Sequence, residues 1–141
     1  MIGWLAGLFL LAHFLAISPA ILIARPAFAD SWLKAGAARL QTLDKITARI
    51  ASVEIAIGQP VRLGTLEIWL DDCRFRPPEE QPEQAAFLRI YDRGYQDGAP
   101  ARQIFSGWMF ASSPAISAME HAVYDVSLIA CSNAASTQSS G

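Results

Sequence analysis

Hydrophobic residues follow three different patterns along this chain of 141 residues. Residues 1–24 are almost continuously apolar, whereas residues 30–46 space their apolar positions as a helix does. From residue 47 onward, short runs alternate apolar and polar positions, which is typical of β-strands with one buried face. These patterns predict an apolar leader, a helical spacer and a β domain.

The β domain is predicted to extend from residue 47 to residue 131. Its strands are expected around residues 53–57, 61–72, 88–91, 102–110 and 122–131. The phase of the alternation changes at Gly64-Thr65, which predicts a β-bulge or a tight corner. Residues 102–110 are apolar on both faces, as in a central strand that is covered on both sides.

The segments between these strands predict loops and one short helix. Residues 74–84 hold three prolines and three glutamates and are expected to form an exposed loop. Ser113 and Pro114 predict the first residues of a short helix, with Ser113 as its N-cap, that ends near Glu120. The elements together predict a mainly β fold, a small antiparallel β-sandwich or a partly open barrel. Residues 132–141, whose largest apolar residue is alanine, are expected to be a disordered tail.

The spacer prediction rests on the spacing of apolar residues between Asp30 and Ile46. Leu33, Ala37 and Leu40 fall near one helical face with Ile46. We therefore expect residues 30–46 to form a partly helical segment that joins the leader to the β domain.

The apolar leader ends in a pattern that signal peptidase recognises. Ala27 and Ala29 are small residues two positions apart, and Asp30 follows them. We expect residues 1–29 to be a signal peptide that is cut between Ala29 and Asp30. An uncleaved membrane anchor is the alternative, because no Lys or Arg precedes the apolar run and about 20 apolar residues span a bilayer. Both alternatives place the rest of the chain in the periplasm or on the periplasmic face of the inner membrane.

The two cysteines, Cys73 and Cys131, both lie in the β domain. An even number of cysteines in a small exported domain predicts a disulfide. A metal site would need more ligands than His121 supplies, and a redox dithiol would show a Cys-x-x-Cys pattern. We therefore expect no metal and no cofactor.

The charge of the chain argues against some classes of partner. Its 11 Lys and Arg residues stand against 13 Asp and Glu residues, and the net charge is −2. Because nucleic-acid binding requires clustered basic residues, we expect no nucleic-acid partner. Contact with a membrane is expected only through the N-terminal segment, if that segment is not cleaved.

A few side chains are candidates for chemistry or for binding. A Ser–His–Asp hydrolase is conceivable with His121, Asp125 and one of Ser106, Ser112 or Ser113, although no Gly-x-Ser-x-Gly motif supports it. A histidine that caps or orders the backbone is the alternative role of His121. The possible interaction surface consists of Trp108, Phe110, Arg74, Arg76 and His121. Core packing is the alternative role of the two aromatic residues.

Several short motifs of this chain also occur together in one protein family. They are LDKIT at 43–47, GQPVRLGTL at 58–66, CR at 73–74, RPPE at 76–79, AFL at 86–88, FSGWMFASSP at 105–114, EH at 120–121 and YDV at 124–126. Through these motifs the chain resembles a family of uncharacterised alphaproteobacterial envelope proteins, domain of unknown function 2155. The resemblance implies export and a β fold, and it brings no known activity.

These observations favour a non-enzymatic envelope module that contacts another protein or a cell-wall component. A periplasmic hydrolase that uses His121 is one alternative. A membrane-anchored accessory subunit of an envelope complex is the other.

Overall fold

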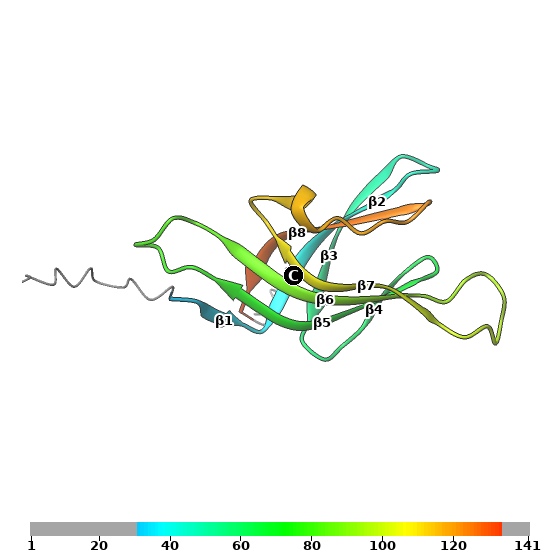
Figure 1. The fold of residues 1–141 in the computed structure, drawn as a ribbon, viewed down its shortest axis with the longest axis horizontal. Coiled ribbons are helices and arrows are strands. Elements are labelled where there is room, and N and C mark those ends of the chain that lie inside the picture. The colour runs from blue at the N-terminus through cyan, green and yellow to red at the C-terminus, as the bar shows by residue number, and fades with distance from the viewer. Residues whose placement is uncertain (1–30, 134–141) are drawn as a thin grey trace, which may run out of the picture.

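The computed structural model describes residues 31–133. The predicted signal peptide, its cut site and the tail beyond residue 133 lie outside these residues. The described part forms eight strands and one 3-10 turn (Figure 1). Their bounds are β1 Leu33–Ala35, β2 Ala37–Asp44, β3 Arg49–Ala56, β4 Val61–Leu63, β5 Leu66–Phe75, β6 Gln84–Asp92, β7 Arg102–Phe110, η1 Pro114–Ser117 and β8 Tyr124–Ser132.

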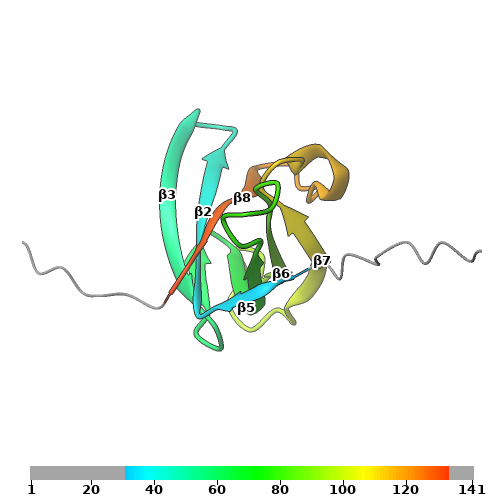
Figure 2. The same cartoon turned by 90° about the vertical axis from the view of Figure 1, so that its left-hand side faces the viewer.

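The strands form two antiparallel sheets. One sheet has the order β1-β5-β6-β7, with β4 also paired to β5, and the other has the order β3-β2-β8. Gly36 joins β1 to β2, so one extended segment passes from the first sheet to the second. Figure 2 shows the two sheets side by side, with β3 at the outer edge of the smaller one. The prediction of a mainly β fold is confirmed, and the described strands form no closed barrel.

The core lies between the two sheets and takes alternate residues from each strand. Its largest fully buried apolar side chains are Leu40, Ile55, Leu66, Ile68, Leu70, Leu88 and Ile90. Tyr124, Val126 and Leu128 of β8 are buried as well. The predicted alternation in β5 and β8 is thus confirmed.

A disulfide between Cys73 and Cys131 joins the two sheets. Cys73 lies in β5 and Cys131 in β8, and their Cα atoms are 5.8 Å apart. The two residues are 58 positions apart in sequence, so the bond removes about 4 kcal/mol of conformational freedom from the unfolded chain in the loop-entropy model. The predicted disulfide is present in the structure.

The predicted helical spacer over residues 30–46 is wrong. β1 and β2 occupy this segment, and the buried residues Ala38, Leu40 and Thr42 alternate with exposed ones. β2 lies between β3 and β8 and pairs with both over its length. Those long-range hydrogen bonds outweigh the helical spacing of the alanines and leucines. The folded domain therefore begins at Leu33 rather than at residue 47, and Ser132 belongs to β8 rather than to the tail.

The prediction that residues 102–110 form a central strand is also wrong. This strand is β7, and it lies at the edge of the five-stranded sheet beyond β6. Met109 is buried in the core, whereas Trp108 and Phe110 point to the outer face of the sheet. The strand is apolar on both faces for two different reasons, because one face packs in the core and the other forms a surface.

The turns agree with the sequence in one place and differ in another. Gly64 and Thr65 form the tight turn between the paired residues Leu63 and Leu66, as one of the two alternatives predicted. The predicted helix is only the 3-10 turn η1, and the Ser113 side chain accepts no capping hydrogen bond. The residues 76–83 connect β5 to β6, as expected for the proline-rich loop.

Candidate functional site

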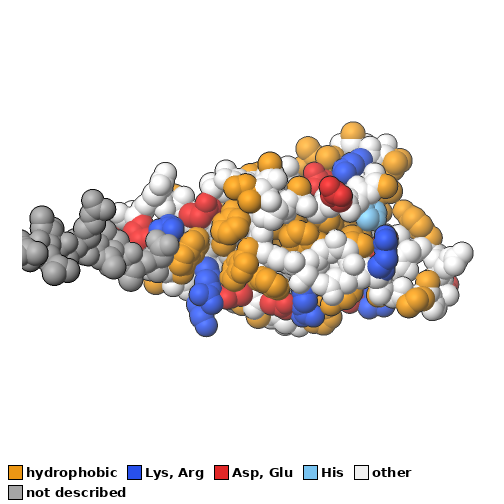
Figure 3. Space-filling model, in the orientation of Figure 1, with side chains coloured by type: hydrophobic (Ala, Val, Ile, Leu, Met, Phe, Trp, Pro, Cys, Tyr) orange, Lys and Arg blue, Asp and Glu red, His pale blue; other side chains and the backbone are white. Residues whose placement is uncertain are grey.

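The outer face of the five-stranded sheet carries a set of aromatic side chains, here called the aromatic face. Its members are Trp69 of β5, Phe87 and Tyr91 of β6, and Trp108 and Phe110 of β7. Phe87 and Trp108 are directly opposed across β6 and β7, and their rings meet edge to face with centroids 5.5 Å apart. All five side chains are partly exposed. Figure 3 shows hydrophobic and charged side chains interspersed over one side of the molecule.

Arginine side chains lie against the tryptophans of this side of the sheet. The guanidinium of Arg74 is 5.9 Å from the ring centre of Trp108, and that of Arg89 is 5.8 Å from the ring centre of Trp69. The guanidinium of Arg76 lies 4.9 Å from the ring centre of Trp32. Such distances allow cation–π attraction, so each arginine has a fixed place on an aromatic surface.

Carboxylates form ion pairs with the same arginines. Arg74 forms an ion pair with Asp72 at 2.7 Å, and Arg89 binds both carboxylate oxygens of Asp71. Asp71 is the extra residue where the register between β5 and β6 shifts, and the shift lets this carboxylate reach Arg89. The hydrogen bond from Arg89 lowers the pKa of Asp71. The side chains of Arg74 and Arg89 are thus held in place by carboxylates of the same sheet.

A groove of about 250 Å³ opens at one end of the aromatic face. It is lined by Trp32, Arg74, Ala85, Trp108 and Phe110, and the cross-strand register places Arg74, Ala85 and Phe110 in one row. Two indole rings and a phenyl ring form its walls, and Ala85 leaves room between them. The groove is therefore a concave and mainly apolar surface.

This groove unites three residues of the predicted interaction surface, Arg74, Trp108 and Phe110. Arg76 does not line the groove but stacks on Trp32, which does. Trp32 was not predicted, because its segment was assigned to a helical spacer. The signal for it in the sequence was a large aromatic side chain within three residues of the small residues 35–38.

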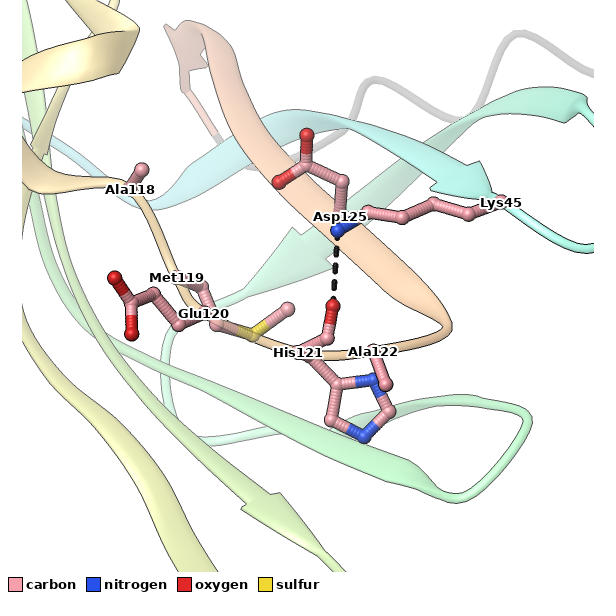
Figure 4. Close-up of a pocket in the computed structure, with 7 residues that line it drawn as sticks. All are labelled: Lys45, Ala118, Met119, Glu120, His121, Ala122 and Asp125. Carbon is pink, nitrogen blue, oxygen red and sulfur yellow. Dashed lines mark hydrogen bonds between the residues drawn. The ribbon is translucent and has the colours of Figure 1, made fainter.

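His121 lies away from the groove, in the segment between η1 and β8 (Figure 4). Its Nδ1 accepts hydrogen bonds from the backbone N–H groups of Val123 and Tyr124, both at 3.1 Å. Its Nε2 is 3.4 Å from a carboxylate oxygen of Asp92, and its backbone carbonyl accepts a hydrogen bond from Lys45 Nζ at 2.9 Å. With Nδ1 as an acceptor, Nε2 carries the proton toward Asp92. The imidazole therefore orders the backbone at the start of β8.

The hypothetical Ser–His–Asp set is not assembled. In Figure 4 the Asp125 carboxylate points away from the imidazole, and Asp125 Oδ1 accepts the backbone N–H of Val126 at 3.2 Å. Ser112 hydrogen-bonds to Glu83, and Ser106 is exposed on the outer face of β7. Both nitrogens of His121 already have partners in the structure. The open depression of about 550 Å³ beside His121 is lined by Lys45 and residues 118–122 and 125, and none of the three candidate serines lines it.

Asp92, the partner of His121, is one of several carboxylates with a lowered pKa. The backbone N–H of Gly94 is the main cause, and hydrogen bonds from Thr65 and His121 add to it. Glu67 likewise has a lowered pKa, chiefly because it accepts a hydrogen bond from the Trp69 indole, with Arg93 also contributing. The hydrogen bonds to Asp92 and Glu67 favour the charged form of these carboxylates. A charged carboxylate accepts structural hydrogen bonds, but it has no proton to donate as a general acid at neutral pH.

Between residues 31 and 133, no group of three or more His, Cys, Asp or Glu side chains is placed to hold a metal ion. Within the same residues, no helix has the length and apolar character needed to cross a membrane.

Comparison with known proteins identifies the family of the chain. Residues 38–131 match a family described as uncharacterized proteins conserved in bacteria, DUF2155. The chain belongs to this family. The match includes β2 to β8 and the aromatic face of the DUF2155 domain, whereas Trp32 on the wall of the groove precedes it. No curated protein and no solved structure matches the chain.

Proposed function

We propose that this DUF2155 protein is an exported, non-enzymatic binding module that holds a protein partner on its aromatic face. The observation that carries the proposal is the groove between Trp32 and Trp108, with Phe110 and Arg74 beside them. Apolar side chains that remain exposed on an ordered surface are typical of interaction sites. The periplasm, or the periplasmic face of the inner membrane, is the proposed location.

A protein segment is the proposed occupant because of the composition of the groove. Tryptophan and arginine are the residues most often found at the energetic centres of protein interfaces. Aromatic-lined grooves of other small β domains accept proline-containing segments, whose extended conformation is already restricted before binding. Asp72 orders Arg74 in advance, which lowers the entropic cost of binding. A glycan of the cell wall is the competing occupant, and the experiment below separates the two.

Two features support export. Residues 1–29 end in the Ala-x-Ala pattern, and Cys73 and Cys131 form a disulfide that an oxidising compartment maintains. The hydrolase alternative lacks support of this kind, since both nitrogens of His121 are engaged with backbone and with Asp92. The anchored accessory subunit differs from the proposal only in retaining residues 1–29.

The proposal is tested by site-specific photocrosslinking in living cells of the native host. A photoreactive amino acid replaces Ser106, which is exposed on the aromatic face, and in a control it replaces Gln41, which is exposed on the outer face of the other sheet. A discrete protein adduct is expected from position 106 and not from position 41. Trp108→Ala is expected to reduce the yield of this adduct by at least tenfold, since hot-spot truncations cost about 2 kcal/mol or more.

The same variants distinguish the possible failures. Arg74→Ala serves as a second variant because the side chain lies on the surface, and circular dichroism shows whether each variant is folded. Sedimentation with isolated peptidoglycan that requires Trp108 would replace the protein partner with a cell-wall glycan. If position 106 yields no adduct that depends on Trp108, and the protein does not sediment with peptidoglycan, the binding function of the groove is refuted.

A further inference from the structure

The edge of β3 in the three-stranded sheet has no neighbouring strand among residues 31–133. β3 pairs with β2 only, and Figure 2 shows it at the outer edge of the sheet. Figure 1 shows the turn end of the β2–β3 hairpin projecting beyond the other strands. As a consequence, residues 49–52 are exposed, and Ile50 is 64% exposed.

The hydrogen-bond register identifies which backbone groups of β3 are available. Ile57 donates its N–H to the carbonyl of Gly36 at 3.0 Å, and the pairing of β2 with β3 continues without a shift from that point. In an antiparallel ladder, bonded residues alternate with non-bonded ones. The odd-numbered residues of β3 therefore bond to β2, and Ile50, Ser52 and Glu54 direct their N–H and C=O groups outward. Ala56 directs its N–H outward as well, but its carbonyl accepts the N–H of Gln59 at 3.1 Å.

This edge has few of the features that usually protect a sheet from strand addition, and its charged residues are Arg49 and Glu54. Soluble proteins cover such edges or place proline, lysine or a bulge in them. The sequence of β3, RIASVEIA, has no proline and no lysine, and its register with β2 has no bulge. The exposed side chains of Ile46, at 76% exposure, and of Ile50 lie at the same end of the hairpin. An eight-residue edge of this kind is a template for another strand.

We propose that the strand added to this edge is β3 of a second copy of the chain. A two-fold axis perpendicular to the sheet makes the two β3 strands antiparallel and the two three-stranded sheets continuous. Two residues that oppose each other across antiparallel strands point to the same face of the sheet, and the two-fold axis leaves every residue on its own face. The axis must therefore pass between one residue and the copy of that residue in the second chain. The choice of that residue decides which side chains face each other.

In the register centred on Val53, the apolar residues of β3 oppose one another, and Arg49 opposes Ile57, just beyond the end of the strand. This register opposes Ile50 to Ala56, Ala51 to Ile55 and Val53 to its own copy, and it opposes Glu54 to the hydroxyl of Ser52. A centre at Ser52 would oppose Glu54 to Ile50 and Arg49 to Ile55, and a centre at Ala51 would oppose Arg49 to Val53. Both of these place a charge against an apolar side chain. In this register, as in the two others, the outward-facing residues of the two copies oppose each other and can hydrogen-bond, so the side chains decide between the registers.

The test compares two substitutions at Ser52 in the full chain, purified as the cell produces it. In the symmetric pair, Ser52→Glu places a glutamate opposite Glu54 of the other copy, so that like charges face each other. Ser52→Lys places a lysine there, so that opposite charges face each other. We expect a dimer by sedimentation velocity, weakened roughly tenfold by Ser52→Glu and not weakened by Ser52→Lys, since opposed charged pairs contribute up to about 1 kcal/mol each. Ser106→Glu, the same change on the exposed face of the other sheet, is the control and leaves association unchanged.

A cysteine at the proposed axis gives an independent measurement. Val53→Cys brings two thiols face to face across the axis and is expected to yield an intermolecular disulfide. Gln103→Cys, exposed on β7, is the control and yields none. A monomeric protein, a dimer that responds equally to both Ser52 substitutions, or cross-linking that is equal at positions 53 and 103 would overturn the proposal. None of these results depends on the aromatic face, so the binding function is tested separately.

Discussion

The phenol ring of Tyr124, at the start of β8, packs directly against the backbone of Gly64 in the turn between β4 and β5. A Cβ atom at position 64 would overlap the phenol, and Gly64 also has a positive φ of 54°. The contact joins a turn of one sheet to the first residue of a strand in the other. Burial of the ring also raises the pKa of Tyr124.

Gly64→Ala is therefore expected to destabilise the domain by about 2–4 kcal/mol, as the sum of overlap with Tyr124 and an unfavourable φ. Urea unfolding followed by tryptophan fluorescence measures the loss. Gly58→Ala is the matched control, because Gly58 has a φ of 77° but no atom within 4 Å of an added Cβ. It should cost only about 1 kcal/mol. Equal losses for the two variants would show that the contact with Tyr124 is unimportant.

Replacing both cysteines by alanine is expected to lower the free energy of unfolding by about 2–5 kcal/mol, because the unfolded chain regains the freedom of a long loop. Thermal unfolding with and without a reductant measures the effect. The reductant should lower the Tm of the native protein to a value near that of the Cys73→Ala, Cys131→Ala protein and leave the variant unchanged. A variant as stable as the oxidised protein would contradict the role assigned to the bond between the sheets.

His121→Ala should cost about 1–3 kcal/mol, since the N–H groups of Val123 and Tyr124 lose their acceptor in a partly buried place. His121→Asn keeps an oxygen close to the position of Nδ1 and should restore most of the loss. His121→Gln, whose amide reaches the position of Nε2 instead, should restore less. Denaturant unfolding of the three variants ranks them. If Gln restores stability better than Asn, contact with Asp92 is the more important one.

The stability of the domain should fall in acid partly through Asp92. Its folded pKa lies below the ordinary value of 3.8, first because of the Gly94 N–H. The charged carboxylate therefore contributes stability above pH 3.8, and this contribution is lost as the pH falls through the lower, folded pKa. Asp92→Asn should be less stable than the native protein at pH 6, with the difference shrinking below pH 4. Urea unfolding at several pH values tests this, and Asp97→Asn in the adjacent exposed loop is the control.

Local alternation was enough to locate β5 and β8 and the buried faces of these strands. Leu66, Ile68 and Leu70 repeat with a period of two, and only one face of a strand reaches the core, so the pattern identifies both the element and its orientation. The pairing of Cys73 with Cys131 needed no geometry either, since two cysteines allow one intramolecular bond.

Tertiary contacts decided the rest. Residues 37–44 have apolar spacings compatible with a helix or a strand, and hydrogen bonds to β3 and β8 make the segment a strand. Trp108 has the same local pattern whether its strand is central or at an edge, and the strand order puts it on a surface. Trp32 and Trp108 line the same groove, although more than seventy residues separate them in the sequence. A local pattern records which face of a strand is apolar, whereas the covering of that face depends on strands distant in the sequence.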